Sequence, residues 1–140
     1  MSRPSMKTKP LLSLDTLTDE MLNAYTACAL WSSMDNSDDQ GGEPLDTNYD
    51  AADIHPDTLA TMRADCAAFL AANAAILETC FGTADQAGHD FWLTRCGHGT
   101  GFWDRDDNVW TPAARDALSD YCRRAGNVDL YIGDDGLIHA

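Results

Sequence analysis

The 140-residue sequence predicts an α+β fold: a single domain in the order ααββαββ, in which helices pack on one face of a small antiparallel sheet. Three stretches carry apolar residues at intervals of three and four, the spacing of a helix that buries one side. Segments rich in aromatic and β-branched residues are separated by glycines, which is typical of strands joined by tight turns. The length suits one domain, so we expect an acidic domain over residues 13–140 after a flexible basic arm over residues 1–12.

Two helices are expected in the N-terminal half of the chain. Over residues 14–33 the apolar groups fall on one helical face, and Ser13 or Asp15 can accept a hydrogen bond from the first-turn amides. The second helix is expected over residues 56–81, because Pro56 suits the first helical turn and the many alanines after it favour a helix.

An acidic loop is expected between these helices, over residues 35–54. The stretch is rich in turn-forming residues and carboxylates and has neither helical nor strand periodicity. Loops of this length within a domain are usually functional or mobile. Leu45, Tyr49 and Ile54 are the apolar residues that we expect to hold it against the core.

A β-hairpin is predicted over residues 89–104. Its two arms are rich in aromatic residues, and the turn between them is punctuated by glycines. In one register Trp92 lies opposite Trp103, a cross-strand aromatic pair. We expect at least one glycine of the turn, at position 97, 99 or 101, to adopt a positive φ.

The C-terminal part is expected to form a third helix and a second hairpin. Residues 111–125 begin with a Thr-Pro pair that suits a helix start and end before a glycine. Residues 128–132 alternate as a strand does, residues 133–136 suit a tight turn, and residues 137–139 suit a short return strand.

Net charge is the strongest feature of the composition. Twenty-three acidic residues face nine basic ones, which gives a formal charge of −14. Such a field repels phosphate backbones and anionic membranes and attracts a basic protein surface. We therefore expect neither direct nucleic-acid binding nor membrane binding. The N-terminus lacks the apolar core of a secretion signal and no run of 18 apolar residues occurs, so we expect a cytoplasmic protein.

Carboxylates are densest in two segments, the loop over residues 35–50 and the segment over residues 104–107. We expect them to form an acidic surface that binds a basic partner, and an exposed tryptophan would also mark a binding surface. The candidate residues of this surface are Asp35, Asp38, Asp39, Glu43, Asp46, Asp104, Asp106 and Asp107.

The five cysteines do not have the pattern of a disulfide framework or of a metal site. Their number is odd and no C-x-x-C pair occurs, so we expect unpaired thiols. Cys28, Cys66 and Cys122 lie beside apolar residues in helical stretches and are expected to be small core residues.

An alternative site lies at the predicted glycine-rich hairpin, where polar residues gather. In this interpretation the chain is a small enzyme or a ligand-binding domain, and the candidate residues are His89, Arg95, His98 and Arg105. Strand geometry keeps His89 far from Cys96, which argues against zinc. No cofactor-binding motif occurs, so we expect no cofactor and no metal. A concave pocket around His98 and Arg95 would favour this alternative, whereas a flat acidic face would favour protein binding.

Residues 88–105 resemble a motif of a family of small proteins encoded by phages and other mobile elements, of the form GHDFWLTRxGHGxGFWDR. Residues 29–33, 43–49, 64–69 and 130–136 agree with the same family. The resemblance carries over no catalytic residue. It implies a mobile-element accessory protein that acts on host machinery. Together with the acidic charge, this leads us to expect a non-enzymatic phage or prophage protein that binds a host protein with a basic nucleic-acid groove, such as a defence complex that it would inhibit.

Overall fold

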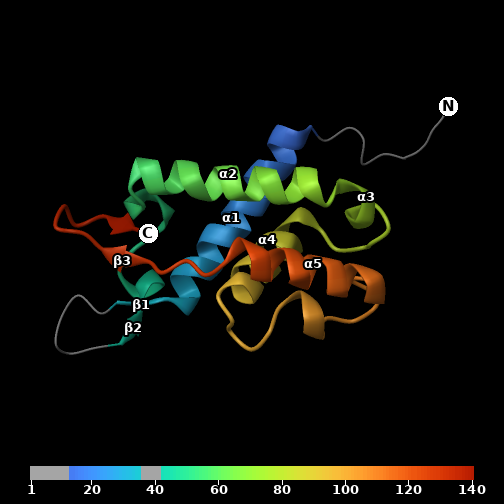
Figure 1. The fold of residues 1–140 in the computed structure, drawn as a ribbon. Helices are drawn as coiled ribbons and strands as arrows, with labels where there is room; N and C mark the ends of the chain where they lie inside the picture. Colours follow the sequence, from blue (N-terminus) through green and yellow to red (C-terminus); the bar gives the residue numbers. More distant parts are fainter. Residues whose placement is uncertain (1–12, 36–41) are drawn as a thin grey trace.

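The computed structural model describes residues 13–35 and 42–140 (Figure 1). Helices make up most of this part of the chain, and the strands are two residues long. The elements are α1 (Leu14–Ser32), β1 (Met34–Asp35), β2 (Glu43–Pro44), α2 (Pro56–Ala72), α3 (Ala74–Leu77), α4 (Ala84–Arg95), α5 (Pro112–Ala125), β3 (Tyr131–Ile132) and β4 (Ile138–His139), with short 3-10 helices η2 (Leu45–Thr47), η3 (Ala51–Asp53) and η4 (Phe102–Asp104).

The fold is α+β, as the sequence predicts, but the strands do not form one sheet that carries the helices. β1 pairs antiparallel with β2, and β3 pairs antiparallel with β4, in two separate ladders. Both lie at one end of the molecule, while the helices pack on one another (Figure 1). The expected order ααββαββ is therefore wrong in its middle part, where a helix replaces the first hairpin.

That replacement is the main correction to the sequence prediction. Residues 89–104 do not form a hairpin: α4 occupies Ala84–Arg95, and η4 follows after a turn. Thr83 starts α4 by accepting a hydrogen bond from the amide of Gln86. Because α4 contacts both α1 and α5, it is buried on more than one side and shows no single apolar stripe. Burial on several sides explains why its aromatic run resembles a strand.

The predicted caps of the outer helices are confirmed. The Ser13 hydroxyl accepts from the amide of Thr16 at the start of α1. Thr111 accepts from the amide of Ala114 at the start of α5, which ends at Gly126 with a φ of 83°. The second helix is shorter than expected, because α2 ends at Ala72 and α3 follows as a separate short helix. At the end of α2, the backbone N–H and the side-chain Nδ2 of Asn73 both donate to the Phe69 carbonyl.

The turn after α4 confirms the predicted positive φ, although it ends a helix rather than joining strands. Gly97, Gly99 and Gly101 have φ values of 68°, 78° and 149°. Gly97 donates to the Thr94 carbonyl and His98 to the Leu93 carbonyl, which closes the last turn of α4. A Cβ on Gly101 would lie 2.0 Å from the Thr94 hydroxyl, so this position also requires close packing.

The core lies where α1, α2, α4 and α5 meet. Phe69 of α2 stacks on Phe91 of α4 and on Phe102 of η4, with ring centroids 4.8 and 5.6 Å apart. α1 and α4 approach so closely that a Cβ on Gly88 would lie 2.2 Å from the Met21 carbonyl oxygen.

No helix in the described part of the chain is both long and apolar enough to cross a membrane.

The segments that flank the core agree with two other predictions. Leu45 and Ile54 are buried and Tyr49 packs against the core, so the expected anchors of the 35–54 segment are confirmed. The C-terminal hairpin also forms, with shorter strands than the predicted 128–132 and 137–139: β3 and β4 pair, and the Ile138 carbonyl accepts from the amide of His55.

Candidate functional site: a groove between α1 and α4

An open groove of about 850 Å³ runs between α1 and the first half of α4. η2 borders the groove, and Arg105 reaches it from the segment after η4. It is lined by Asn23, Ala24, Ala27, Cys28, Trp31, Asp46, Thr83, Asp85, Gln86, His89 and Arg105. Residues far apart in the sequence therefore meet here because α4 lies against α1.

Two aromatic side chains are the most exposed flat surfaces of the groove. The Trp31 residue is 57% exposed, which is unusual for an indole. The His89 ring lies near it, with centroids 6.4 Å apart and ring planes 29° from parallel. His89 Nδ1 is buried, lies 3.7 Å from Asp90 Oδ1 and has no hydrogen-bond partner among the described residues.

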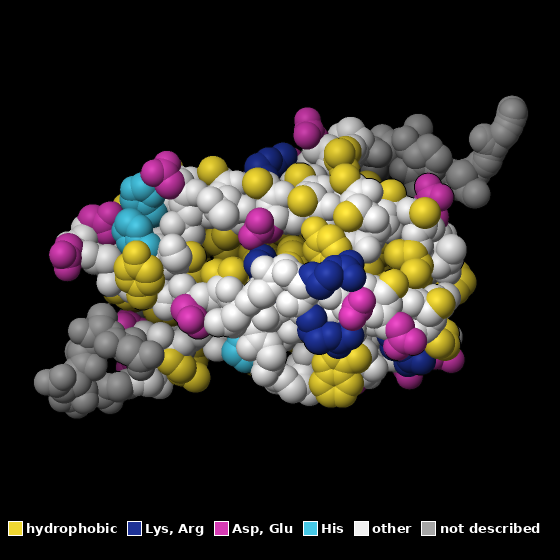
Figure 2. Space-filling model, viewed as in Figure 1, with side chains coloured by type: hydrophobic (Ala, Val, Ile, Leu, Met, Phe, Trp, Pro, Cys, Tyr) yellow, Lys and Arg dark blue, Asp and Glu magenta, His cyan; other side chains and the backbone are white. Residues whose placement is uncertain are grey.

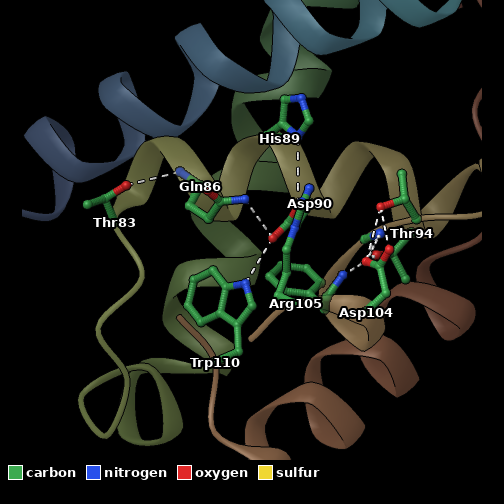
Figure 3. A network of polar contacts seen from close by, with 11 residues as sticks. Thr83, Gln86, His89, Asp90, Thr94, Asp104, Arg105 and Trp110 are labelled. Carbon is green, nitrogen blue, oxygen red and sulfur yellow. Dashed lines mark hydrogen bonds and ion pairs between the residues drawn. The ribbon is translucent and has the colours of Figure 1, made fainter. Parts of the chain in front are cut away.

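A buried carboxylate supports the groove from behind (Figure 3). Asp90 is 0% exposed and accepts four hydrogen bonds. Arg105 donates Nε and Nη2 to Oδ1 at 3.0 and 2.7 Å, while Gln86 Nε2 and Trp110 Nε1 donate to Oδ2 at 3.0 and 2.9 Å. The hydrogen bond to Asp90 raises the pKa of Arg105. Arg105 is thus the partner that balances a buried charge.

Two further carboxylates, Asp46 from η2 and Asp85 from the first turn of α4, line the groove and are exposed. The side-chain nitrogen of Gln86 donates to Asp90, so the side-chain oxygen of Gln86 remains available as an acceptor. Arg105 is the single cationic side chain among the lining residues, and Asp90 already neutralises it. The groove therefore offers a cation an aromatic face together with several oxygen acceptors.

The acids predicted to form a binding surface are only partly brought together. Asp46 lines the groove, and Asp35 and Glu43 lie in β1 and β2, just before it in the chain. Glu43 accepts a hydrogen bond from the Asn48 side chain at 3.1 Å. Asp38 and Asp39 lie outside the described residues.

The second predicted acidic segment follows η4 and has local structural partners. Asp104 accepts from the Gly101 amide at 2.9 Å and from the Thr100 hydroxyl. Partial burial raises its pKa, but these hydrogen bonds outweigh it, so the pKa is lowered overall. Asp106 and Asp107 are both exposed, and Asp107 pairs with Arg115 at 2.7 Å.

The acidic side chains do not gather into one flat patch on the face drawn in Figure 2, where they are scattered singly. All six arginines in the described part of the chain pair with aspartates. The carboxylates of Asp46 and Asp85 that line the α1/α4 groove have no arginine partner among these ion pairs.

The four residues of the alternative site are divided by the fold. His89 and Arg105 line the α1/α4 groove, but Arg95 is buried elsewhere, with a side chain 7% exposed. Arg95 donates to the Tyr25 hydroxyl, to Asp65 and to the carbonyls of Ala125 and Gly126. Its role is structural, so the prediction of a single site around these four residues is wrong.

His98 is exposed beside a smaller hollow of about 210 Å³ that also contains Cys96. Burial raises the pKa of the Cys96 thiol, which disfavours a thiolate nucleophile there.

All five cysteines are free, and Cys28, Cys66 and Cys122 are buried as predicted, with burial raising each pKa to about 12. No group of three or more His, Cys, Asp or Glu in the described residues could hold a metal ion.

Several residues of the groove were not predicted from the sequence, namely Asn23, Asp85 and Gln86. A helical reading of residues 84–95 would have placed Asp85, Gln86 and His89 on one side of a helix, within a turn of one another. An exposed tryptophan is the feature that the sequence analysis expects at a binding surface, and Trp31, which is exposed, lines the groove.

The chain matches no protein-family model, no curated protein and no solved structure in the three comparisons made.

Proposed function

We propose that the chain is a protein-binding module that holds a basic segment of a partner in the α1/α4 groove. The observation that carries this proposal is the composition of the groove: an indole 57% exposed beside two unburied carboxylates, with its one arginine already paired. A cation over an indole face gains about 0.5–1 kcal/mol at an exposed site. The carboxylates add attraction that steers a basic partner from a distance.

The whole-chain charge supports the same class of partner. A charge of −14 disfavours nucleic acid and anionic membrane as ligands and favours a basic protein surface. We propose a host protein as that partner and a phage or prophage accessory role for the chain, in the cytoplasm of a bacterial host. A host protein that holds DNA or RNA, such as a defence complex, has the required basic surface. Occlusion of that surface by this chain would inhibit the complex.

The location of binding is tested by an NMR titration of the ¹⁵N-labelled chain with a peptide of alternating glycine and basic residues, half of them lysine and half arginine. We expect shift changes in the amides of Ala24, Ala27 and Gln86 and in the Trp31 indole, and we expect them to shrink at high salt. Changes scattered over acidic side chains on every face, or no changes, would contradict the proposal.

A further inference from the structure

We infer that the α1/α4 groove selects arginine over lysine, with the guanidinium lying on the Trp31 indole and donating to the oxygen acceptors of the groove. This inference rests on the proposed function and specifies which basic side chain of the partner the groove binds. Its basis is the combination of a flat aromatic surface with acceptors from more than one element.

The flat surface comes first. Trp31 projects from the last turns of α1 and leaves its indole largely exposed, while the buried tryptophans of the chain, Trp92 and Trp110, each bond to a side-chain oxygen. The His89 ring continues this surface at a centroid distance of 6.4 Å. A guanidinium is planar and stacks on aromatic rings, whereas an ammonium is a compact and strongly hydrated charge.

The acceptors come second. Asp46 on η2, Asp85 on α4 and the free amide oxygen of Gln86 line the same groove. Five N–H groups in a fixed fork can bond to acceptors on several elements at once, while the three donors of an ammonium radiate from one point. The distribution of acceptors over η2 and α4 therefore matches a guanidinium better.

The groove also disfavours an anionic side chain. The donors of Arg105 are directed at Asp90, which is fully buried and fixes the Arg105 head group at 2.7 Å. An arginine that enters the groove meets two exposed carboxylates and a cation already paired. A carboxylate that enters meets the same two like charges.

The inference is tested with three fluorescent peptides of equal length, in which four glycines alternate with four arginines, four lysines or four citrullines. Fluorescence anisotropy at low ionic strength gives the affinity of each peptide for the full chain. We expect the arginine peptide to bind about fivefold more tightly than the lysine peptide. The citrulline peptide has a similar shape without the charge and is expected to bind least.

Two variants separate the indole contact from general charge. Trp31→Leu should weaken binding of the arginine peptide and reduce its preference over the lysine peptide, and Trp31→Phe should retain more of that preference than Trp31→Leu. Trp103→Leu is the matched control, because Trp103 is 52% exposed but does not line the groove. Unchanged thermal unfolding of each variant establishes that the fold is intact.

The outcomes separate this inference from the function on which it rests. Equal affinity for arginine and lysine peptides, both abolished at high salt and both mapped to the groove, overturns the selectivity and leaves the proposed function standing. Citrulline binding as tight as arginine binding also overturns it. Binding of none of the three peptides overturns the proposed function itself.

Discussion

α4 carries two buried charges of opposite sign, and the protein satisfies them in different ways. Asp90 is surrounded by side-chain donors, from Gln86, Arg105 and Trp110. Arg95 instead donates to the backbone carbonyls of Ala125 and Gly126, in addition to Tyr25 and Asp65, and lies 5.1 Å from the centre of the Phe91 ring.

The two networks differ in their relation to the α1/α4 groove. Two of the three residues that bond to Asp90, Gln86 and Arg105, also line the α1/α4 groove, so its wall depends on one buried carboxylate. The carbonyls of Ala125 and Gly126 that accept from Arg95 hold the chain after α5 against α4, and its other partners, Tyr25 and Asp65, lie on α1 and α2.

The largest effect is expected from Asp90→Asn. The change removes the charge that balances Arg105 and leaves one of the buried donors without an acceptor, because an amide has one oxygen where the carboxylate has two. We expect a loss of about 3–4 kcal/mol in the free energy of unfolding, measured by urea denaturation. Asp116→Asn, at an exposed position of α5, is the control and should change it by less than about 0.5 kcal/mol.

A smaller loss is expected from Arg95→Met, about 2 kcal/mol by the same measurement. Methionine keeps the contact with Phe91, and Asp65 is partly exposed, so it can take its lost hydrogen bond from water. The carbonyls of Ala125 and Gly126 lose a donor. If Arg95→Met costs more than Asp90→Asn, the contrast between the two charges is wrong.

Two buried indoles sharpen the comparison. Trp110 donates Nε1 to the Asp90 carboxylate at 2.9 Å, whereas Trp92 donates Nε1 to the neutral Ser32 hydroxyl at 2.8 Å. A hydrogen bond to a charged acceptor is about twice as strong as a neutral one. Trp110→Phe should therefore destabilise the protein by about 1 kcal/mol more than Trp92→Phe. Equal losses would show that Asp90 does not depend on the indole.

The smallest effect is expected from an exposed pair, Asp135 with His139. Their hydrogen bond, 2.9 Å from Nε2 to Oδ1, lowers the pKa of Asp135 below its ordinary value of 3.8. The stability from this group is therefore present above pH 4 and is lost as the pH falls through the lower, folded-state pKa. Thermal unfolding should show a small difference between the parent and Asp135→Asn near pH 5 that vanishes near pH 2. A difference that grows on acidification would contradict this assignment.

Elements with local signals could be predicted from the sequence. The caps at Ser13 and Thr111 and the terminating glycine at 126 act within one helical turn, and the structure confirms all three. α4 could not be recognised, because its burial on several sides removes the helical period and leaves aromatic residues that favour strands. Tertiary packing overrode local propensity there.

The prediction of strands in place of α4 also explains why the four residues of the alternative site were expected to lie together. His89 and Arg105 belong to the groove because a helix lies against α1, while Arg95 on that helix turns toward the core. Asp46 of the predicted acidic loop lines the groove, whereas Asp85 could be placed there only once α4 was known to be a helix. Convergence of residues from separate elements depends on the packing, which one sequence does not display.

The central claim is that the groove, and not negative charge in general, holds a basic segment. The most direct test compares two double variants that each remove two negative charges: Asp46→Asn with Asp85→Asn in the groove, and Asp116→Asn with Asp134→Asn at exposed positions outside it. Titration calorimetry with the mixed lysine and arginine peptide measures both. The groove variant should bind about fivefold more weakly than the control variant. Equal affinities of the two variants would contradict the claim.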